Sequence, residues 1–290
     1  MKVFIFGLGY SALHFVHIFH EDFSGISGTV RHTEKCEALE PLGIKAFVFS
    51  AESCDPAAGA ALLQCDAVIV SIPPDGQGDP VLGAFNSVLQ SMTRLQRVIY
   101  LSTVGVYGDH QGLWIDETAE LNPVSERSKR RIDAENEWQA FARKRGCDLH
   151  ILRLAGIYGP GRNAIENLRA GKARRIIKKD QVFNRIHVED IGRAIQACLA
   201  SSLPTGVHIW NIADNEPSPP QDVVTYAAAL SGLPPPPEMP FETADLSPMA
   251  RSFYGENKRI SKRAMREDLG VQLAFPSYRE GLQGLAKNSA

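Results

Sequence analysis

The sequence predicts an α/β protein that is built on a doubly wound parallel sheet and carries a smaller C-terminal lobe. Short apolar runs of four or five residues recur through the first 211 residues. Segments with helical spacing of apolar residues separate these runs, and the first run ends in a glycine-rich loop. Such alternation is typical of βαβ units, whose parallel strands are covered by helices on both faces. A chain of 290 residues can form one large domain or two modest ones.

The individual elements follow from these patterns in chain order. Strands are expected at 2–6, 26–30, 46–49, 67–70, 97–101, 149–153 and 207–211. Helices are expected at 11–19, 34–39, 81–90, 132–145 and 190–199. After Gly161 the chain becomes rich in Arg and Lys, and the prolines at 234–237 predict an extended linker. We therefore assign residues 1–156, together with about 186–212, to the sheet domain, and residues 157–185 and 213–290 to the second lobe.

The composition excludes several classes of protein. Apolar residues make up 44% of the chain and charged residues 22%, and the net charge is −2, so no overall field attracts nucleic acid or membrane. No apolar run approaches the roughly 20 residues of a membrane span. The five cysteines have no metal-ligand spacing and are typical of reduced thiols. We expect a cytoplasmic protein that binds no metal, nucleic acid or membrane.

The loop after the first strand predicts a dinucleotide site. Residues 6–12 read FGLGYSA and fit the pattern G-x-G-x-x-A between a strand and a helix. The first glycine allows a tight turn, the second leaves room for a pyrophosphate, and Ala12 lets the helix pack closely. The alternative is a plain strand–helix turn without a ligand. The predicted contacts are Gly7, Leu8, Gly9, Tyr10, Ser11 and Ala12.

The end of the second strand favours NADP over NAD, although NAD stays open. A NAD-binding chain usually places Asp or Glu there to bind the ribose hydroxyls. This chain has Arg31 and His32 instead, and a guanidinium suits a 2′-phosphate. The alternative is that Arg31 covers the adenine or points to solvent.

Several segments resemble those of the extended and atypical short-chain dehydrogenase/reductases, the NAD-dependent epimerase/dehydratase group. They are LSTVGVYG at 101–108, LRLAGIYGPG at 152–161, RIHVED at 185–190 and WNIA at 210–213. The glycine loop, SIPPDGQGD at 71–79, NKRIS at 257–261 and YREGL at 278–282 resemble the YeeZ-like subgroup. The resemblance implies a Rossmann-type fold, a substrate-binding second lobe, a small-molecule substrate and a possible homodimer. It also places Ser71, Ile72 and Pro73 at the cofactor.

The resemblance raises a question about catalysis. The family normally uses a Ser or Thr, a Tyr and a Lys. Thr103 and Lys129 match, whereas Ser125 stands at the Tyr position, and a serine hydroxyl is a far weaker acid than phenol. Tyr107, Asp109 and His110 are therefore alternative proton donors.

Two classes of function stay open: an oxidoreductase or epimerase of atypical mechanism, and an NADP-binding sensor without hydride chemistry. A third, scaffold role for the cofactor is weaker. The basic run between residues 169 and 179 is either a solvated face or part of a site for an anionic substrate such as a nucleotide-linked sugar.

Overall fold

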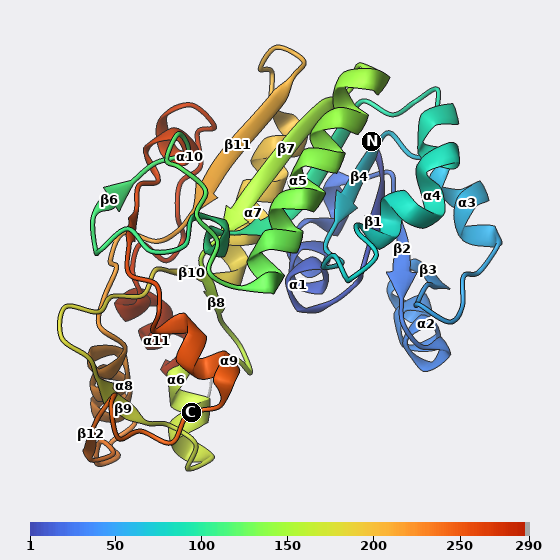
Figure 1. The fold of residues 1–290 in the computed structure, drawn as a ribbon. Coiled ribbons are helices and arrows are strands. Elements are labelled where there is room, and N and C mark those ends of the chain that lie inside the picture. The colour runs from blue at the N-terminus through green and yellow to red at the C-terminus, as the bar shows by residue number, and fades with distance from the viewer. Residues whose placement is uncertain (288–290) are drawn as a thin grey trace. The chain divides into compact units, whose positions relative to one another are not determined.

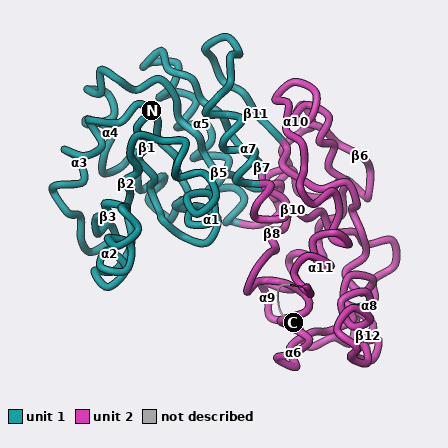
Figure 2. Tube along the Cα trace, turned by 180° about the vertical axis from the view of Figure 1, so that it is seen from behind, with its two compact units in different colours: residues 1–103, 126–153, 191–210 teal, residues 104–125, 154–190, 211–290 magenta. Residues whose placement is uncertain are grey.

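The structure, a computed structural model, describes residues 1–287 and forms two compact units (Figure 2). Unit 1 comprises Met1–Thr103, Glu126–Arg153 and Ile191–Trp210. Unit 2 comprises Val104–Ser125, Leu154–Asp190 and the chain from Asn211 onward. The predicted partition differs at residues 104–125, 154–156, 186–190 and 211–212, all of which it placed with the sheet and which belong to unit 2. The segment 104–125 packs in unit 2, since a strand within it pairs with residues near position 260.

Unit 1 contains the seven-stranded sheet that the sequence predicts, which confirms the α/β fold (Figure 1). The strand order is β3-β2-β1-β4-β5-β7-β11, and the registers of β1 with β2 and β4, of β2 with β3 and of β4 with β5 are parallel. The strands are β1 (Lys2–Phe6), β2 (Gly25–Val30), β3 (Lys45–Val48), β4 (Ala67–Val70), β5 (Arg97–Thr103), β7 (Asp148–Leu154) and β11 (Val207–Ile212). The winding direction reverses between β1 and β4, and ligands of such sheets bind at the carboxyl ends of the strands at this reversal.

Helices connect these strands and bury their apolar sides. They are α1 (Tyr10–Phe19), α2 (Thr33–Leu39), α3 (Ala57–Leu62), α4 (Pro80–Ser91), α5 (Glu126–Arg145) and α7 (Val188–Ala200), with short 3-10 turns at His20–Asp22 and Glu40–Leu42. Helix α5 begins six residues before the predicted 132–145. Its first two turns are mostly charged and exposed, so they carry no apolar periodicity that a sequence pattern could detect. Its later turns place Trp138 in the core beside Tyr100.

Unit 2 is assembled from three short parallel strand pairs and several helices. The pairs are β6 (Trp114–Ile115) with β13 (Arg259–Ile260), β8 (Gly156–Tyr158) with β10 (Arg185–His187), and β9 (Arg175–Ile177) with β12 (Glu238–Pro240). The helices are α6 (Ala164–Arg169), α8 (Pro220–Leu230), α9 (Pro248–Phe253), α10 (Arg263–Glu267) and α11 (Tyr278–Lys287), with a 3-10 turn at Val104–Tyr107. Its cores are small and aromatic, around Tyr158 and Tyr278 in one cluster and Tyr254 in another.

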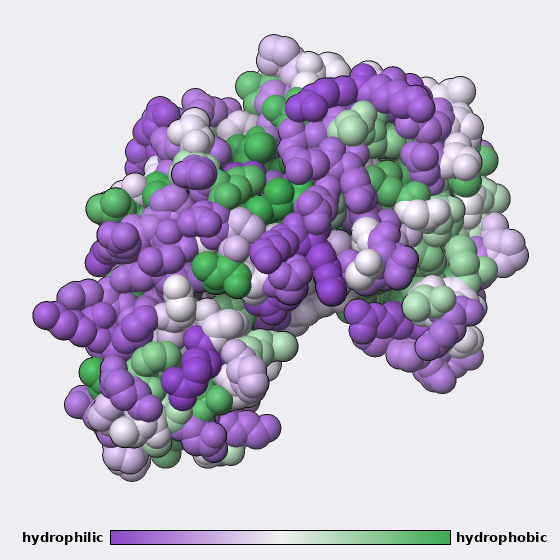
Figure 3. All heavy atoms as spheres, viewed as in Figure 1, coloured by the Kyte–Doolittle hydropathy of each residue, from purple (hydrophilic) through white to green (hydrophobic). Residues whose placement is uncertain are grey.

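On the face drawn in Figure 3, hydrophilic residues prevail and apolar residues lie in scattered groups between them. Within residues 1–287, none of the helices combines the length and the apolar character that crossing a membrane requires. The same residues contain no group of three or more His, Cys, Asp or Glu side chains arranged to hold a metal ion.

Candidate functional site

The glycine loop lies at the point where the winding of the sheet reverses. Gly7 follows β1 with a φ of +88°, which side chains rarely adopt, and a Cβ there would lie 2.9 Å from Cγ1 of Ile72. Ile72 follows β4, and the Ser71 N–H donates to the Phe6 carbonyl at 2.9 Å. Gly7 is therefore required by the fold, because it allows the ends of β1 and β4 to approach each other.

Neighbouring groups in unit 1 already bind the first amides of the loop. The Gly7 N–H donates to Thr29 Oγ1 at 2.9 Å, the Leu8 N–H to the Thr29 carbonyl at 2.8 Å, and the Gly9 N–H to the Gly7 carbonyl at 2.8 Å. Leu8 itself is buried in the core. Helix α1 then begins with Gly9 as N-cap, without a side-chain cap and without an acidic residue in its first turn. Its first-turn amides and its dipole are therefore suited to a bound anion.

Gly9 differs from Gly7 in what it requires. Its φ of −93° is ordinary for any residue, and a Cβ would meet only the Gly7 carbonyl, at 4.0 Å. Ala12, one turn into α1, is 1% exposed and packs closely, as predicted for the third position of the motif. Open space in front of Gly9, next to a helix N-terminus, is the arrangement that a pyrophosphate needs.

The residues predicted to favour NADP over NAD directly follow β2. Arg31 and His32 are both exposed, and His32 is the N-cap of α2 without a side-chain cap bond. Gly28, in the same strand, cannot bear a side chain, because its Cβ would lie 2.3 Å from the Ile5 carbonyl oxygen. The close approach of β1 and β2 thus places Arg31 near the glycine loop along the carboxyl edge of the sheet.

The loop after β4 is held at its far end. Asp79 caps α4 by accepting the amides of Val81 and Leu82, and it also accepts the Trp138 indole N–H at 3.0 Å. Burial raises the pKa of Asp79. Ser71 and Ile72 are half-buried and Pro73 is exposed. The loop predicted to contact the cofactor is therefore anchored to both β1 and α5.

The predicted catalytic residues belong to different units. Thr103 ends β5 and Lys129 lies in the first turn of α5, so both are in unit 1. The Lys129 side chain is 55% exposed and pairs with Glu126 at 2.7 Å. Ser125, immediately before α5, belongs to unit 2 and is half-buried. Their shared role in catalysis stays a prediction.

The three alternative donors lie close together in the chain in unit 2, and each of them has a hydrogen-bond partner there. Tyr107 is fully buried, and its hydroxyl donates to Asn211 Oδ1 at 2.8 Å. Asp109 Oδ1 accepts the Asn257 N–H at 2.7 Å and the Gln111 N–H at 3.2 Å. His110 is half-buried, with Nε2 at 3.1 Å from the Tyr107 carbonyl.

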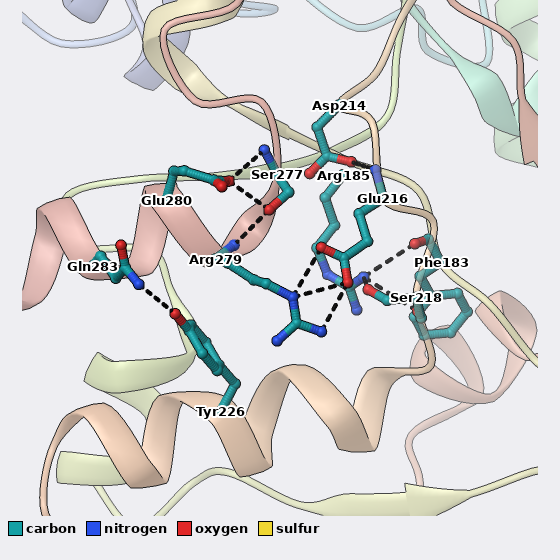
Figure 4. A network of polar contacts seen from close by, with 10 residues as sticks. All are labelled: Phe183, Arg185, Asp214, Glu216, Ser218, Tyr226, Ser277, Arg279, Glu280 and Gln283. Carbon is teal, nitrogen blue, oxygen red and sulfur yellow. Dashed lines mark hydrogen bonds and ion pairs between the residues drawn. The ribbon is translucent and has the colours of Figure 1, made fainter.

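A polar network, buried at Asp214 and Ser218 and exposed at Arg279, joins β10, the segment after β11 and α11 of unit 2 (Figure 4). Arg185 Nη1 donates to Ser218 Oγ at 2.8 Å, and Arg279 pairs with Glu216 at 2.9 Å. Asp214 is 2% exposed. Its Oδ1 accepts the Glu216 N–H at 3.0 Å, while Oδ2 has no hydrogen-bond partner among the described residues. Burial raises the pKa of Asp214 to about 7, although the Glu216 amide and the Arg185 guanidinium act in the opposite direction.

Sequence reasoning missed a second buried cluster, in unit 1. Glu135 of α5 accepts hydrogen bonds from Arg153 of β7 and Ser102 of β5. Two signals point to it in the sequence. Arg153 ends a strand candidate that is apolar except for His150, and Glu135 lies on the inner face of the helix, three residues before Trp138.

Comparison with known proteins agrees with this architecture. The model of the NAD dependent epimerase/dehydratase family matches residues 81–213. Protein YeeZ of Escherichia coli strain K12 is similar at 33% identity over 245 residues, 81% of this chain and 85% of that protein. A conserved protein of unknown function from Silicibacter pomeroyi DSS is 42% identical, with a TM-score of 0.88 over 99% of both chains. UDP-glucuronic acid 4-epimerase from Bacillus cereus, solved with NAD, shares the fold at 17% identity, with a TM-score of 0.76 over 100% of this chain and 99% of that one.

Proposed function

Because the chain belongs to the NAD-dependent epimerase/dehydratase family, in the YeeZ-like subgroup, we propose that unit 1 binds a nicotinamide dinucleotide. The pyrophosphate lies against the start of α1, at the carboxyl ends of β1 and β4. The observation that carries this proposal is the space at Gly9, where the fold itself would accept a Cβ. A pyrophosphate close to the first-turn amides explains glycine at this position.

NADP is the proposed cofactor, and NAD is the second choice. The support is Arg31, an exposed cation directly after β2, in the place where an acid would bind the ribose of NAD. A guanidinium forms charge-assisted, bidentate bonds with phosphate. The Bacillus cereus epimerase was solved with NAD, so a direct comparison of the two dinucleotides is needed.

The proposed reaction is an oxidoreduction or an epimerisation at a hydroxyl-bearing carbon. When bound, the dinucleotide accepts or donates a hydride at its nicotinamide ring. Thr103 is proposed to hold the substrate oxygen and Lys129 to hold the ribose, as the family resemblance implies. Ser125 cannot supply the usual phenol, so the proton that leaves or joins the substrate oxygen needs another carrier.

His110 is the alternative donor best suited to that task. A carbonyl oxygen only accepts hydrogen bonds, so the Nε2 that faces the Tyr107 carbonyl carries the proton in the neutral ring. Nδ1 of the same ring is then free of a proton and can act as a base. Tyr107 already uses its proton for Asn211, and Asp109 already accepts two amides.

The proposed substrate is a small carbonyl or hydroxyl compound, nucleotide-linked or otherwise anionic. The basic run of unit 2 supports this class in part. Arg174 and Lys178 donate to backbone carbonyls and Arg175 pairs with Glu238, whereas Lys172 is exposed. The exposed Lys172 and Lys179, which take no part in these bonds, are therefore the cations of the run that we propose for a ligand.

A sensor that binds NADP without turning over a substrate is the second candidate. Two observations favour it: serine replaces the phenol at position 125, and the buried Tyr107 hydroxyl is committed to Asn211. Thr103 favours the enzyme, because a protein that only binds the dinucleotide does not need a hydroxyl for a substrate oxygen.

Calorimetric titration of the full chain with NADPH and NADH tests the cofactor proposal. We expect binding of both, with NADPH the tighter ligand, and no binding of either would overturn it. The NADP form is then incubated with UDP-glucose and UDP-glucuronic acid while nicotinamide absorbance and the sugar NMR signals are followed. Reduction of the nicotinamide or inversion of a sugar carbon supports the enzyme, and binding without either change supports the sensor.

A further inference from the structure

A buried ion pair connects α5 to the sheet close to the predicted nicotinamide end of the site. Arg153 donates to Glu135 Oε2 from Nη2 at 2.7 Å and to Oε1 from Nε at 3.3 Å, a bidentate arrangement. Glu135 is 1% exposed and Arg153 3% exposed. Ser102, itself buried, donates its hydroxyl to the same carboxylate. One carboxylate of α5 therefore binds β5 and β7 together.

The pair lies at the carboxyl ends of both strands, where a dinucleotide is proposed to bind. Ser102 is the next-to-last residue of β5 and Arg153 the next-to-last residue of β7. Thr103 follows Ser102 directly. Lys129 precedes Glu135 by six residues on the same helix, which is roughly 9 Å along its axis. Thr103 thus adjoins a residue of the cluster in β5, and Lys129 lies on the same helix as Glu135.

Stability alone is a poor explanation for such a pair. Removing two charges from water costs much of what their attraction returns, and apolar residues of similar volume often serve as well or better. A polar anchor does, however, fix the register of a helix. The other buried side chains of α5 near the pair, Ala134, Trp138 and Phe141, are apolar, and apart from the Trp138 indole bond to Asp79 their contacts tolerate small slides. A slide of one residue would move Lys129 by about 1.5 Å and rotate it by about 100°.

Arg131 adds a second anchor in the same part of the helix. Its Nη1 donates to the Tyr100 hydroxyl at 3.0 Å and to the Leu101 carbonyl at 3.0 Å, and its guanidinium lies over the Tyr100 ring. These bonds again join α5 to β5, at Tyr100 and Leu101. They cannot replace the Glu135 pair, because they bind β5 and not β7.

We propose that Glu135 and Arg153, with Ser102, are positioning residues that set α5 and the end of β5 so that Lys129 and Thr103 can hold the nicotinamide half of the cofactor. The inference rests on the proposed function, since it assumes that unit 1 binds a dinucleotide. It predicts that the pair raises the affinity for the nicotinamide half of the cofactor. The affinity for the adenine half should not depend on the pair, because the glycine loop and Arg31 are proposed to bind that half.

The same two strands provide a matched control at their other ends. Arg97 begins β5 and Asp148 begins β7, and their side chains form an ion pair at 3.4 Å, with exposed fractions of 14% and 5%. Arg97 also donates to carbonyl oxygens at and beyond the end of α7. Arg153→Lys and Arg97→Lys therefore make one chemical change at opposite ends of the same strands.

Each variant is titrated with NADPH and with adenosine 2′,5′-bisphosphate, the adenine half of NADP, and its melting temperature is recorded. We expect Arg153→Lys to bind NADPH at least about tenfold more weakly, the loss of roughly one charge-assisted bond. Its affinity for the bisphosphate should change less than twofold. Arg97→Lys should change neither affinity, whatever its melting temperature.

Three results would overturn the inference. Arg153→Lys could bind NADPH as tightly as the wild type, it could lose affinity for both ligands alike, or Arg97→Lys could show the same selective loss. A wild type that binds neither ligand would instead overturn the proposed function itself.

An apolar replacement keeps the test valid if Arg153→Lys does not fold. The triple variant Ser102→Ala, Glu135→Met and Arg153→Met removes the carboxylate, the guanidinium and the hydroxyl together. None of these three groups is then left buried without the other two as hydrogen-bond partners. We expect a melting temperature close to that of the wild type and the same selective loss of NADPH affinity. Full NADPH affinity in this variant would show that the pair serves packing alone.

Discussion

The predicted site residues of the two units differ in how far the fold itself occupies their polar groups. In unit 1, Gly9 faces open space at the start of α1, and the side chains of Arg31 and Lys129 are exposed, although Lys129 also pairs with Glu126. In unit 2, Tyr107 and Asp109 are occupied by Asn211 and by backbone amides. Binding groups for a ligand must be left unsatisfied by the fold, whereas satisfied groups stabilise it. The comparison favours unit 1 as the better-defined ligand site.

The largest expected effect is the loss of cofactor binding in Gly9→Val. The branched side chain would occupy the space proposed for the pyrophosphate, while the fold offers no clash. Calorimetry should detect no NADPH binding, and the far-UV spectrum and the unfolding transition should be kept. Gly28→Ala is the matched control, because its Cβ would lie 2.3 Å from the Ile5 carbonyl oxygen and should lower stability instead. Unchanged affinity in Gly9→Val would refute a dinucleotide at this loop.

The next largest effect is a pH dependence of the free energy of unfolding that arises from Asp214 in unit 2. Its pKa is raised by burial to about 7 from the ordinary value of 3.8, so the folded state holds a proton that the unfolded state releases. This contribution to stability is complete below about pH 4 and is lost as pH rises through 7. Between pH 5 and pH 8 it amounts to at most about 3 kcal/mol.

Urea unfolding of the wild type and of Asp214→Asn at these two pH values measures that contribution. The amide keeps an acceptor for the Glu216 N–H and cannot ionise. We therefore expect the free energy of unfolding of the variant to fall less with pH than that of the wild type. Parallel pH dependence in the two proteins would show that Asp214 is ionised throughout.

A smaller effect is expected from Arg31→Ala, which should weaken NADPH binding by roughly tenfold to a hundredfold, the value of a charge-assisted bond to phosphate. NADH binding should be nearly unchanged, because NADH has no 2′-phosphate. Lys35→Ala removes an exposed cation from the adjoining helix α2 and serves as the control for general charge. If Arg31→Ala still binds NADPH more tightly than NADH, another residue must bind the 2′-phosphate.

Lys129→Ala is expected to weaken NADPH binding by about tenfold, since its proposed partner is the ribose. Arg130→Ala is a suitable control, because Arg130 is the neighbouring residue and is also exposed. Equal losses in the two variants would indicate a general charge effect at the start of α5.

The smallest effect is expected from Ser125→Ala. An essential general acid contributes roughly 100- to 10,000-fold to turnover. We expect Ser125→Ala to lower the turnover of any substrate found by less than about tenfold, and His110→Ala to lower it by an amount within the range of a general acid. A collapse of kcat in Ser125→Ala alone would show that the serine has taken over the proton transfer.

Some of these features were predictable because they depend on local patterns. Short stretches of sequence specify the apolar strands, the helices between them and the strand–glycine–helix junction. The structure confirms the α/β fold. The start of α5 was predicted six residues late, because a charged, exposed turn carries no apolar period. The segment 104–125 was predicted to lie with the sheet, since no local signal reveals that it pairs with Arg259–Ile260.

By itself, then, the sequence determined the doubly wound sheet, the glycine loop and the candidate contacts at its edge, because each is specified by residues close together in the chain. Only the tertiary structure decided which polar groups are engaged. The Tyr107 hydroxyl meets Asn211, and Glu135 meets Arg153, across separations that no spacing rule encodes. Burial and hydrogen-bond partners are properties of packing, and they determine whether a side chain supports the fold or remains available to a ligand.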